Sequence, residues 1–161
     1  WGPHRWNGWD TKSIVDANTG EPTELYHQVK ALNQAVLAMG DTLLGLTSED
    51  VAHTNPPAGH PAFEKNKHWI ADIQASDALI GFLRGPNGDR YALVVNQLHG
   101  MNKSAAATAD KIELTFSKDV TAVEAVNWLD GKPGMLALKD RKATLRICGG
   151  TGVLLKAGRG E

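Results

Sequence analysis

Histidine is the first residue type to consider as a candidate for a functional site, because its side chain can bind metals and transfer protons. Six are present, and three of them, His53, His60 and His68, lie in one proline-rich stretch. A zinc site needs convergent ligands, often at short spacings such as HxxxH or CxxC, and neither pattern occurs here. We therefore expect solvated or hydrogen-bonded histidines, and we assign no metal and no other cofactor.

Carboxylates, one thiol and a glycine run are the other groups that could take part in catalysis or ligand binding. Glycosidases use two carboxylates about 5–10 Å apart across the scissile bond, but the acids here are scattered and nothing marks a pair. Cys148 closes an apolar strand and is expected to be a small buried residue. Residues 149–152 lack the following helix and the Lys-Ser/Thr pair of a phosphate loop, so we expect a turn. We assign no catalytic residue.

Tryptophans are the remaining candidates for a site. Trp1, Trp6 and Trp9 crowd into nine positions, while Trp69 and Trp128 lie in the β-rich part of the chain. Large rings bury area wherever they can, which favours packing of the early three onto the next helix and a core position for the later two. The alternative is a substrate-binding role, in which Trp6, Trp9, Trp69 and Trp128 stack on sugar rings.

The bulk properties narrow the possible partners. The 161 residues suffice for one domain, or for one domain with an appended segment. A net charge of −1 provides no electrostatic footprint for nucleic acid or an anionic membrane. The apolar runs are too short to span a bilayer. The first residues lack the basic and apolar regions of a signal peptide, so localisation stays open.

One amphipathic helix is expected near the start of the chain. Residues 21–24, Glu-Pro-Thr-Glu, form a start signal, because proline is tolerated in the first turn and acids suit the positive end of the helix dipole. Gly40 suits the position just after a helix end. The apolar residues recur at spacings of four, three, four and three, which defines a stripe of Leu25, Val29, Leu32, Val36 and Met39.

Domain organisation follows from composition. Residues 47–67 hold three prolines and read as a linker. They separate an aromatic loop plus helix, residues 1–46, from an all-β region, residues 68–157, and a short tail, residues 158–161.

The β region is organised around the stretch from Ala78 to Gln97. Two apolar arms flank Gly85–Asp89, where proline and Asn-Gly favour a chain reversal. Neither arm alternates cleanly, so we expect both of their faces to be covered. The predicted fold is an antiparallel β-sandwich of about eight strands preceded by an amphipathic α-helix. The strands are expected at residues 69–74, 77–84, 89–97, 111–117, 120–129, 135–138, 142–147 and 153–156.

The order of these features resembles a known family. The segment NTGEPTELYHQVKALNQAVLAMGDTLLGLTSEDVAHT, residues 18–54, is similar to the last helix of the (β/α)8 barrel in clan A, β-galactosidase-like glycoside hydrolases. The pieces YALVVNQ, IELTFSKDVTAVEAVNWLDGKP and LRICGGTGVLLK resemble the C-terminal β-sandwich of these enzymes. In the family the catalytic glutamates lie on earlier barrel strands, which this sequence does not contain.

The resemblance implies a non-catalytic accessory domain of an enzyme that acts on carbohydrate. We expect no activity from this chain alone, and the implied partners are the catalytic barrel of a parent enzyme and carbohydrate. A secreted or periplasmic location is implied by the resemblance only. A carbohydrate-binding module and a protein-interaction β-sandwich remain the alternatives.

Overall fold

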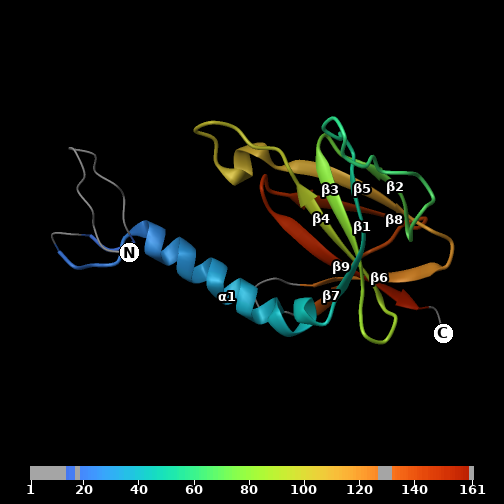
Figure 1. Ribbon diagram of the computed structural model, residues 1–161, viewed down its shortest axis with the longest axis horizontal. Helices are drawn as coiled ribbons and strands as arrows, with labels where there is room; N and C mark the ends of the chain where they lie inside the picture. Colours follow the sequence, from blue (N-terminus) through green and yellow to red (C-terminus); the bar gives the residue numbers. More distant parts are fainter. Residues whose placement is uncertain (1–13, 17–18, 127–131, 160–161) are drawn as a thin grey trace.

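The chain folds as a helix followed by a β-sandwich. The computed structural model describes residues 14–16, 19–126 and 132–159. Within them, one α-helix precedes nine strands arranged in two antiparallel sheets (Figure 1). The predicted fold class, a sandwich preceded by a helix, is confirmed.

Six strands form the larger sheet and three form the smaller one. The larger sheet has the order β1-β3-β4-β9-β6-β7. Its strands are β1 (Thr47–His53), β3 (Ala78–Arg84), β4 (Arg90–Asn96), β9 (Gly152–Arg159), β6 (Val120–Val126) and β7 (Pro133–Met135). The smaller sheet consists of β2 (Ile70–Gln74), β5 (Asp110–Phe116) and β8 (Lys142–Ile147). A short 3-10 helix, η1 (Ala105–Thr108), precedes β5.

The hairpin of β3 and β4 has the predicted turn. The two strands pair in register from Ala78↔Asn96 to Arg84↔Arg90. The Gly85 N–H donates to the carbonyl of Asp89 at 2.8 Å, and Gly88 has a φ of 77°, which glycine adopts without strain. The local turn signal therefore defines the pairing of these two central strands.

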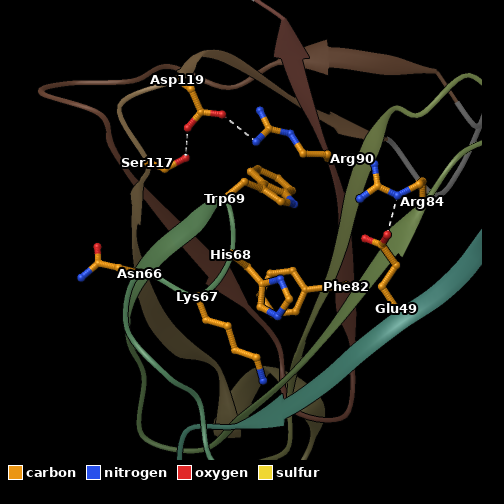
Figure 2. A pocket seen from close by; sticks show the side chains of 10 residues that line it. All are labelled: Glu49, Asn66, Lys67, His68, Trp69, Phe82, Arg84, Arg90, Ser117 and Asp119. Atoms are coloured by element: carbon orange, nitrogen blue, oxygen red, sulfur yellow. Dashed lines mark hydrogen bonds and ion pairs between the residues drawn. The ribbon is translucent and has the colours of Figure 1, made fainter.

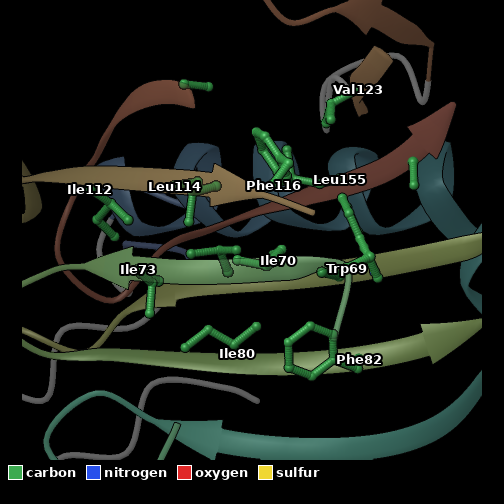
Figure 3. Close-up of a cluster of buried hydrophobic side chains, with 14 of the residues drawn as sticks. Trp69, Ile70, Ile73, Ile80, Phe82, Ile112, Leu114, Phe116, Val123 and Leu155 are labelled. Atoms are coloured by element: carbon green, nitrogen blue, oxygen red, sulfur yellow. The ribbon is translucent and has the colours of Figure 1, made fainter. Parts of the chain in front are cut away.

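The core lies between the two sheets. Side chains alternate along each strand, so Ile80 and Phe82 of β3 face inward toward Leu114 and Phe116 of β5 (Figure 3). These four side chains are at most 1% exposed. Each contributes about 1.5–3 kcal/mol by leaving water, which makes this cluster the main source of stability.

The outer face of the larger sheet is also apolar. Leu79, Leu83, Leu93 and Val95 point away from the core and are half-buried. Antiparallel sheets commonly expose a polar outer face, so this composition is unusual. The expectation that both faces of the hairpin are covered holds for the inner face, whereas the outer face remains partly open.

Helix α1 (Glu24–Leu44) is longer than expected. Gly40 lies inside the helix, so its assignment as the residue after the end was wrong. A glycine costs a helix only about 1 kcal/mol, and the good helix formers Leu43 and Leu44 continue the pattern beyond it. The helix ends at Gly45, whose N–H donates to the carbonyl of Thr42 at 3.2 Å. The N-terminal end of α1 extends away from the sandwich (Figure 1).

The expected linker begins too early. Residues 47–53 form β1, an edge strand that pairs with β3. Its polar sequence TSEDVAH lacks the apolar run that marks a central strand, because an edge strand needs only a few buried side chains. The connection from β1 to β2 therefore begins at Thr54, and β9 reaches Arg159 rather than residue 156. Residues 127–129, the end of the strand expected at residues 120–129, lie outside the described residues.

Candidate functional site

A cleft opens beside the end of the β3–β4 hairpin. Its volume is about 360 Å³, and its lining comes from β1, the loop before β2, β3, β4 and the turn between β5 and β6 (Figure 2). The lining residues are Glu49, Asn66, Lys67, His68, Trp69, Phe82, Arg84, Arg90, Ser117 and Asp119. Ten residues separated by up to 70 positions in the sequence thus share one concave surface.

Two arginine–carboxylate pairs form the walls of the cleft. Arg84 and Arg90 are direct partners across the β3–β4 ladder. The Nε of Arg84 donates to Glu49, and the Nη1 of Arg90 donates to Asp119 at 2.7 Å. The pairing of β1 with β3 shifts by one residue between Ser48 and Asp50, which makes Glu49 the extra residue of a bulge. Bulges re-aim side chains, and this one accompanies the approach of Glu49 to Arg84.

Aromatic rings form the floor. Trp69 is 5% exposed and stacks on Phe116, with ring centres 5.8 Å apart. His68 stacks on Phe82 at 3.9 Å between ring centres, and its Nε2 lies 2.6 Å from the Oδ2 of Asp50. The floor is therefore continuous with the core and is held rigidly.

The charges of the cleft compensate one another. The Ser117 hydroxyl, and after it Arg90, lower the pKa of Asp119 from 3.8 to about 2. Hydrogen bonds from His68 and Lys67 lower the pKa of Asp50, and hydrogen bonds to Asp50 and Glu64 raise the pKa of Lys67. Asp119, Asp50, Arg90 and Lys67 are therefore charged at neutral pH, and each of the two cations has a carboxylate beside it.

Asp119 is unsuited to act as a general acid in the cleft. Its two lining carboxylates, Glu49 and Asp119, are both engaged by arginines. A glycosidase pair requires one carboxyl group that stays protonated at working pH. A pKa of about 2 gives Asp119 no such role. The arrangement instead presents fixed hydrogen-bonding groups around a cavity.

Of the four candidate tryptophans, Trp69 alone lies among the residues that the structure describes. Trp69 belongs to the core, as the packing alternative predicted, and a ring that is 5% exposed offers no open face for stacking on a sugar. Its edge nevertheless lines the cleft. Trp6, Trp9 and Trp128 lie outside the described residues. Sequence reasoning missed Glu49, Arg84, Arg90 and Asp119, since no motif links them before β1, β3 and β4 pair.

Two expected hydrogen-bonding histidines are confirmed. The Nδ1 of His53 lies 3.0 Å from the Oε1 of Gln97, and His68 is paired with Asp50. In the part of the chain that the structure describes, no three His, Cys, Asp or Glu side chains gather in a way that could hold a metal ion.

A second candidate surface is the apolar stripe of α1. Leu25, Val29, Leu32 and Val36 are between 38% and 56% exposed, and among the described helix residues only Ala35 is buried. Surface helices normally turn such a stripe toward a core. The stripe therefore has the composition of a contact surface without the burial of one.

Comparison with known proteins leaves the family open. No protein-family model, no curated protein and no solved structure matches this chain. Among the described helices, none is long and apolar enough to cross a membrane. The functional argument therefore depends on the cleft and on the two apolar surfaces.

Proposed function

We propose that this chain is a non-catalytic accessory domain of a glycoside hydrolase, which docks on the catalytic barrel of that enzyme through α1. The proposal combines the resemblance of residues 18–54 to a last barrel helix with the physical state of that helix. Its apolar stripe is exposed, although the spacing of the stripe is that of a buried helix face.

The exposed stripe of α1 carries this proposal. Leu32 and Val36 lie at its centre and are 56% and 54% exposed. Contiguous apolar surface of this kind marks an interaction site more often than a solvated face. A neighbouring barrel helix would bury it by the same packing that joins helices within a domain.

The outer face of the six-stranded sheet supports the same conclusion. One cross-strand row passes through Val51, Gly81, Leu93, Leu154 and Val126. Val51 is 39% exposed, whereas Leu154 and Val126 are buried. Val51 therefore adds one exposed apolar side chain at the β1 edge of this face, beside the half-buried Leu93.

An assay with chromogenic glycosides tests whether the chain alone has glycosidase activity. We expect the chain alone to release no product from chromogenic β-galactosides, β-glucosides or β-xylosides, while a longer enzyme that contains it turns over at least one of them. Turnover by the chain alone would overturn the proposal.

Docking is tested with paired variants of α1. In the barrel-containing enzyme, Leu32→Asp with Val36→Asp should lower the melting temperature clearly, because buried charge at a helix contact is costly. In the chain alone the same pair should change stability by less than about 1 kcal/mol, since both positions are more than half exposed. Gln34→Asp, on an exposed polar position of the same helix, is the matched control.

A second copy of the chain is the competing occupant of the stripe. The spacing of Val29 and Val36 with Leu25, Leu32 and Met39 also fits the a and d positions of a two-stranded coiled coil. Light scattering of the chain alone separates the two cases. A stable dimer that the double variant dissociates would replace barrel docking as the role of α1.

A further inference from the structure

We infer that the cleft between Arg84, Arg90 and Trp69 binds an uncharged saccharide of one or two sugar units. The site lies on the sandwich and uses none of the apolar stripe of α1. It is therefore a separate function from docking and can be present whether or not the helix contacts a barrel.

The charge balance of the lining favours a neutral ligand. Arg84 and Arg90 are each neutralised by a carboxylate that belongs to the same lining, Glu49 and Asp119. The third cation, Lys67, is held by Asp50 at 3.0 Å. An anionic ligand would have to compete with these fixed carboxylates, and a cationic one with the arginines. A ligand without net charge meets neither cost.

The hydrogen-bonding capacity left over suits hydroxyl groups. Each arginine uses only part of its five N–H donors, because Arg84 donates through Nε and Nη1 and Arg90 through Nη1 alone to described residues. The second oxygen of Glu49 accepts no bond from a described residue. Planar donors beside carboxylate acceptors can bind neighbouring sugar hydroxyls, each of which donates and accepts.

The indole of Trp69 adds a donor at the floor. Its N–H has no hydrogen-bond acceptor among the described residues, yet no buried side-chain nitrogen or oxygen in that part of the chain lacks a partner. The indole nitrogen is therefore not sealed inside the core. Since the edge of Trp69 lines the cleft, this N–H is available to a bound ligand (Figure 2).

The shape and rigidity of the cleft agree with a small ligand. Its volume of about 360 Å³ lies at the lower end of the range for small-molecule sites. Both arginines project from paired β-strands and are restrained by ion pairs, so little side-chain freedom is lost on binding. The His68 ring, stacked on Phe82, provides a flat aromatic face against which sugar C–H groups can pack.

The choice of a saccharide over other neutral polyols rests on the proposed function, whereas the existence of a polyol site rests on the cleft alone. The test uses the whole chain, labelled with ¹⁵N, titrated with methyl β-galactoside, cellobiose and xylobiose. Glycerol and sodium glucuronate serve as the polyol and the anionic comparison. We expect saturable shifts of the Trp69 indole signal and of the Arg84 and Arg90 amides with at least one neutral sugar.

Matched variants assign the binding to the cleft. Arg84→Gln and Asp119→Asn should each weaken binding about tenfold, because each removes a charged hydrogen-bonding group. Glu113→Gln removes a carboxylate that is 44% exposed, is paired with Lys111 and lies outside the cleft on β5, so it should leave binding unchanged. The amide spectrum of each variant shows directly whether the fold is retained.

Three results would overturn the inference. These are the absence of saturable shifts with every neutral sugar at millimolar concentration, tighter binding of glucuronate than of the neutral sugars, and equal weakening by Glu113→Gln. Saturable binding of glycerol at the same strength would retain the polyol site and remove the saccharide. Failure of the α1 variants to affect the barrel-containing enzyme would contradict docking and would leave the inference of a saccharide site in the cleft unchanged.

Discussion

Asn96 is the fully buried polar residue that joins the two sheets at the end of β4. Its Nδ2 donates to the carbonyls of Thr108 and Ile147 at 3.0 and 2.9 Å, and its Oδ1 accepts from the Leu98 N–H at 2.9 Å. Ile147 belongs to the smaller sheet and Asn96 to the larger one. A single amide thus satisfies three backbone groups from different elements.

Replacing Asn96 should destabilise the fold strongly. Asn96→Ala removes these three hydrogen bonds from a region shielded from water, at about 1–3 kcal/mol for each buried group that water cannot reach. We expect a loss of about 3 kcal/mol in the free energy of unfolding, measured by urea denaturation. Gln74→Ala, at an exposed position of β2, is the control and should change little. Equal effects at the two positions would contradict this role.

At the scale of elements, local signals predicted the structure where they were strong. Pro86, Asn87 and Gly88 define a turn by their own backbone preferences, so the β3–β4 hairpin could be predicted without knowledge of the rest of the chain. Gly40 misled the prediction because a glycine inside a helical pattern and a glycine after its end look alike in sequence. Strand β1 escaped prediction because pairing with β3, rather than its own composition, makes it a strand.

Gly40 offers a test at this scale. An added Cβ would meet nothing within 4 Å, and the position lies inside α1. Gly40→Ala should therefore stabilise the helix by about 1 kcal/mol through reduced backbone freedom. Far-UV circular dichroism during heating measures the effect. Ala31→Gly, at an exposed position of the same helix, should lower stability by a similar amount; a loss of helicity in Gly40→Ala would contradict the open surroundings of the site.

At the scale of the whole molecule, the fold could be predicted from sequence while the cleft could not. Apolar residues that alternate with polar ones, such as Ile112, Leu114 and Phe116, predict a half-buried strand in any sandwich. The cleft instead depends on Glu49 meeting Arg84 and on Arg90 meeting Asp119. These pairs are 35 and 29 residues apart, and no spacing rule connects them.

Acid should destabilise the molecule through the depressed pKa of Asp119. A carboxyl whose pKa is lower when folded adds stability above its unfolded pKa, and that stability is lost as pH falls through the folded value. For Asp119 the window runs from about pH 4 down to about pH 2, and Asp50 acts in the same direction. The side chain is 58% exposed, so screening by water and salt keeps the effect modest.

The variant Asp119→Asn isolates this contribution. We expect it to be less stable than the parent at about pH 6 and nearly equal to it at about pH 2, as judged by urea midpoints. A difference that stays constant across this range would show that the charge of Asp119 does not contribute to stability.

The position of β9 in the larger sheet has a consequence for biosynthesis. β9 is the last strand in the described chain, yet it lies in the interior of the sheet, between β4 and β6. During translation, β1, β3, β4 and β6 are therefore synthesised before β9, the strand that joins β4 to β6. We expect nascent chains to stay incompletely folded until β9 emerges, and a premature stop codon before Gly152 should yield two disconnected sheet fragments instead of a slightly shortened domain.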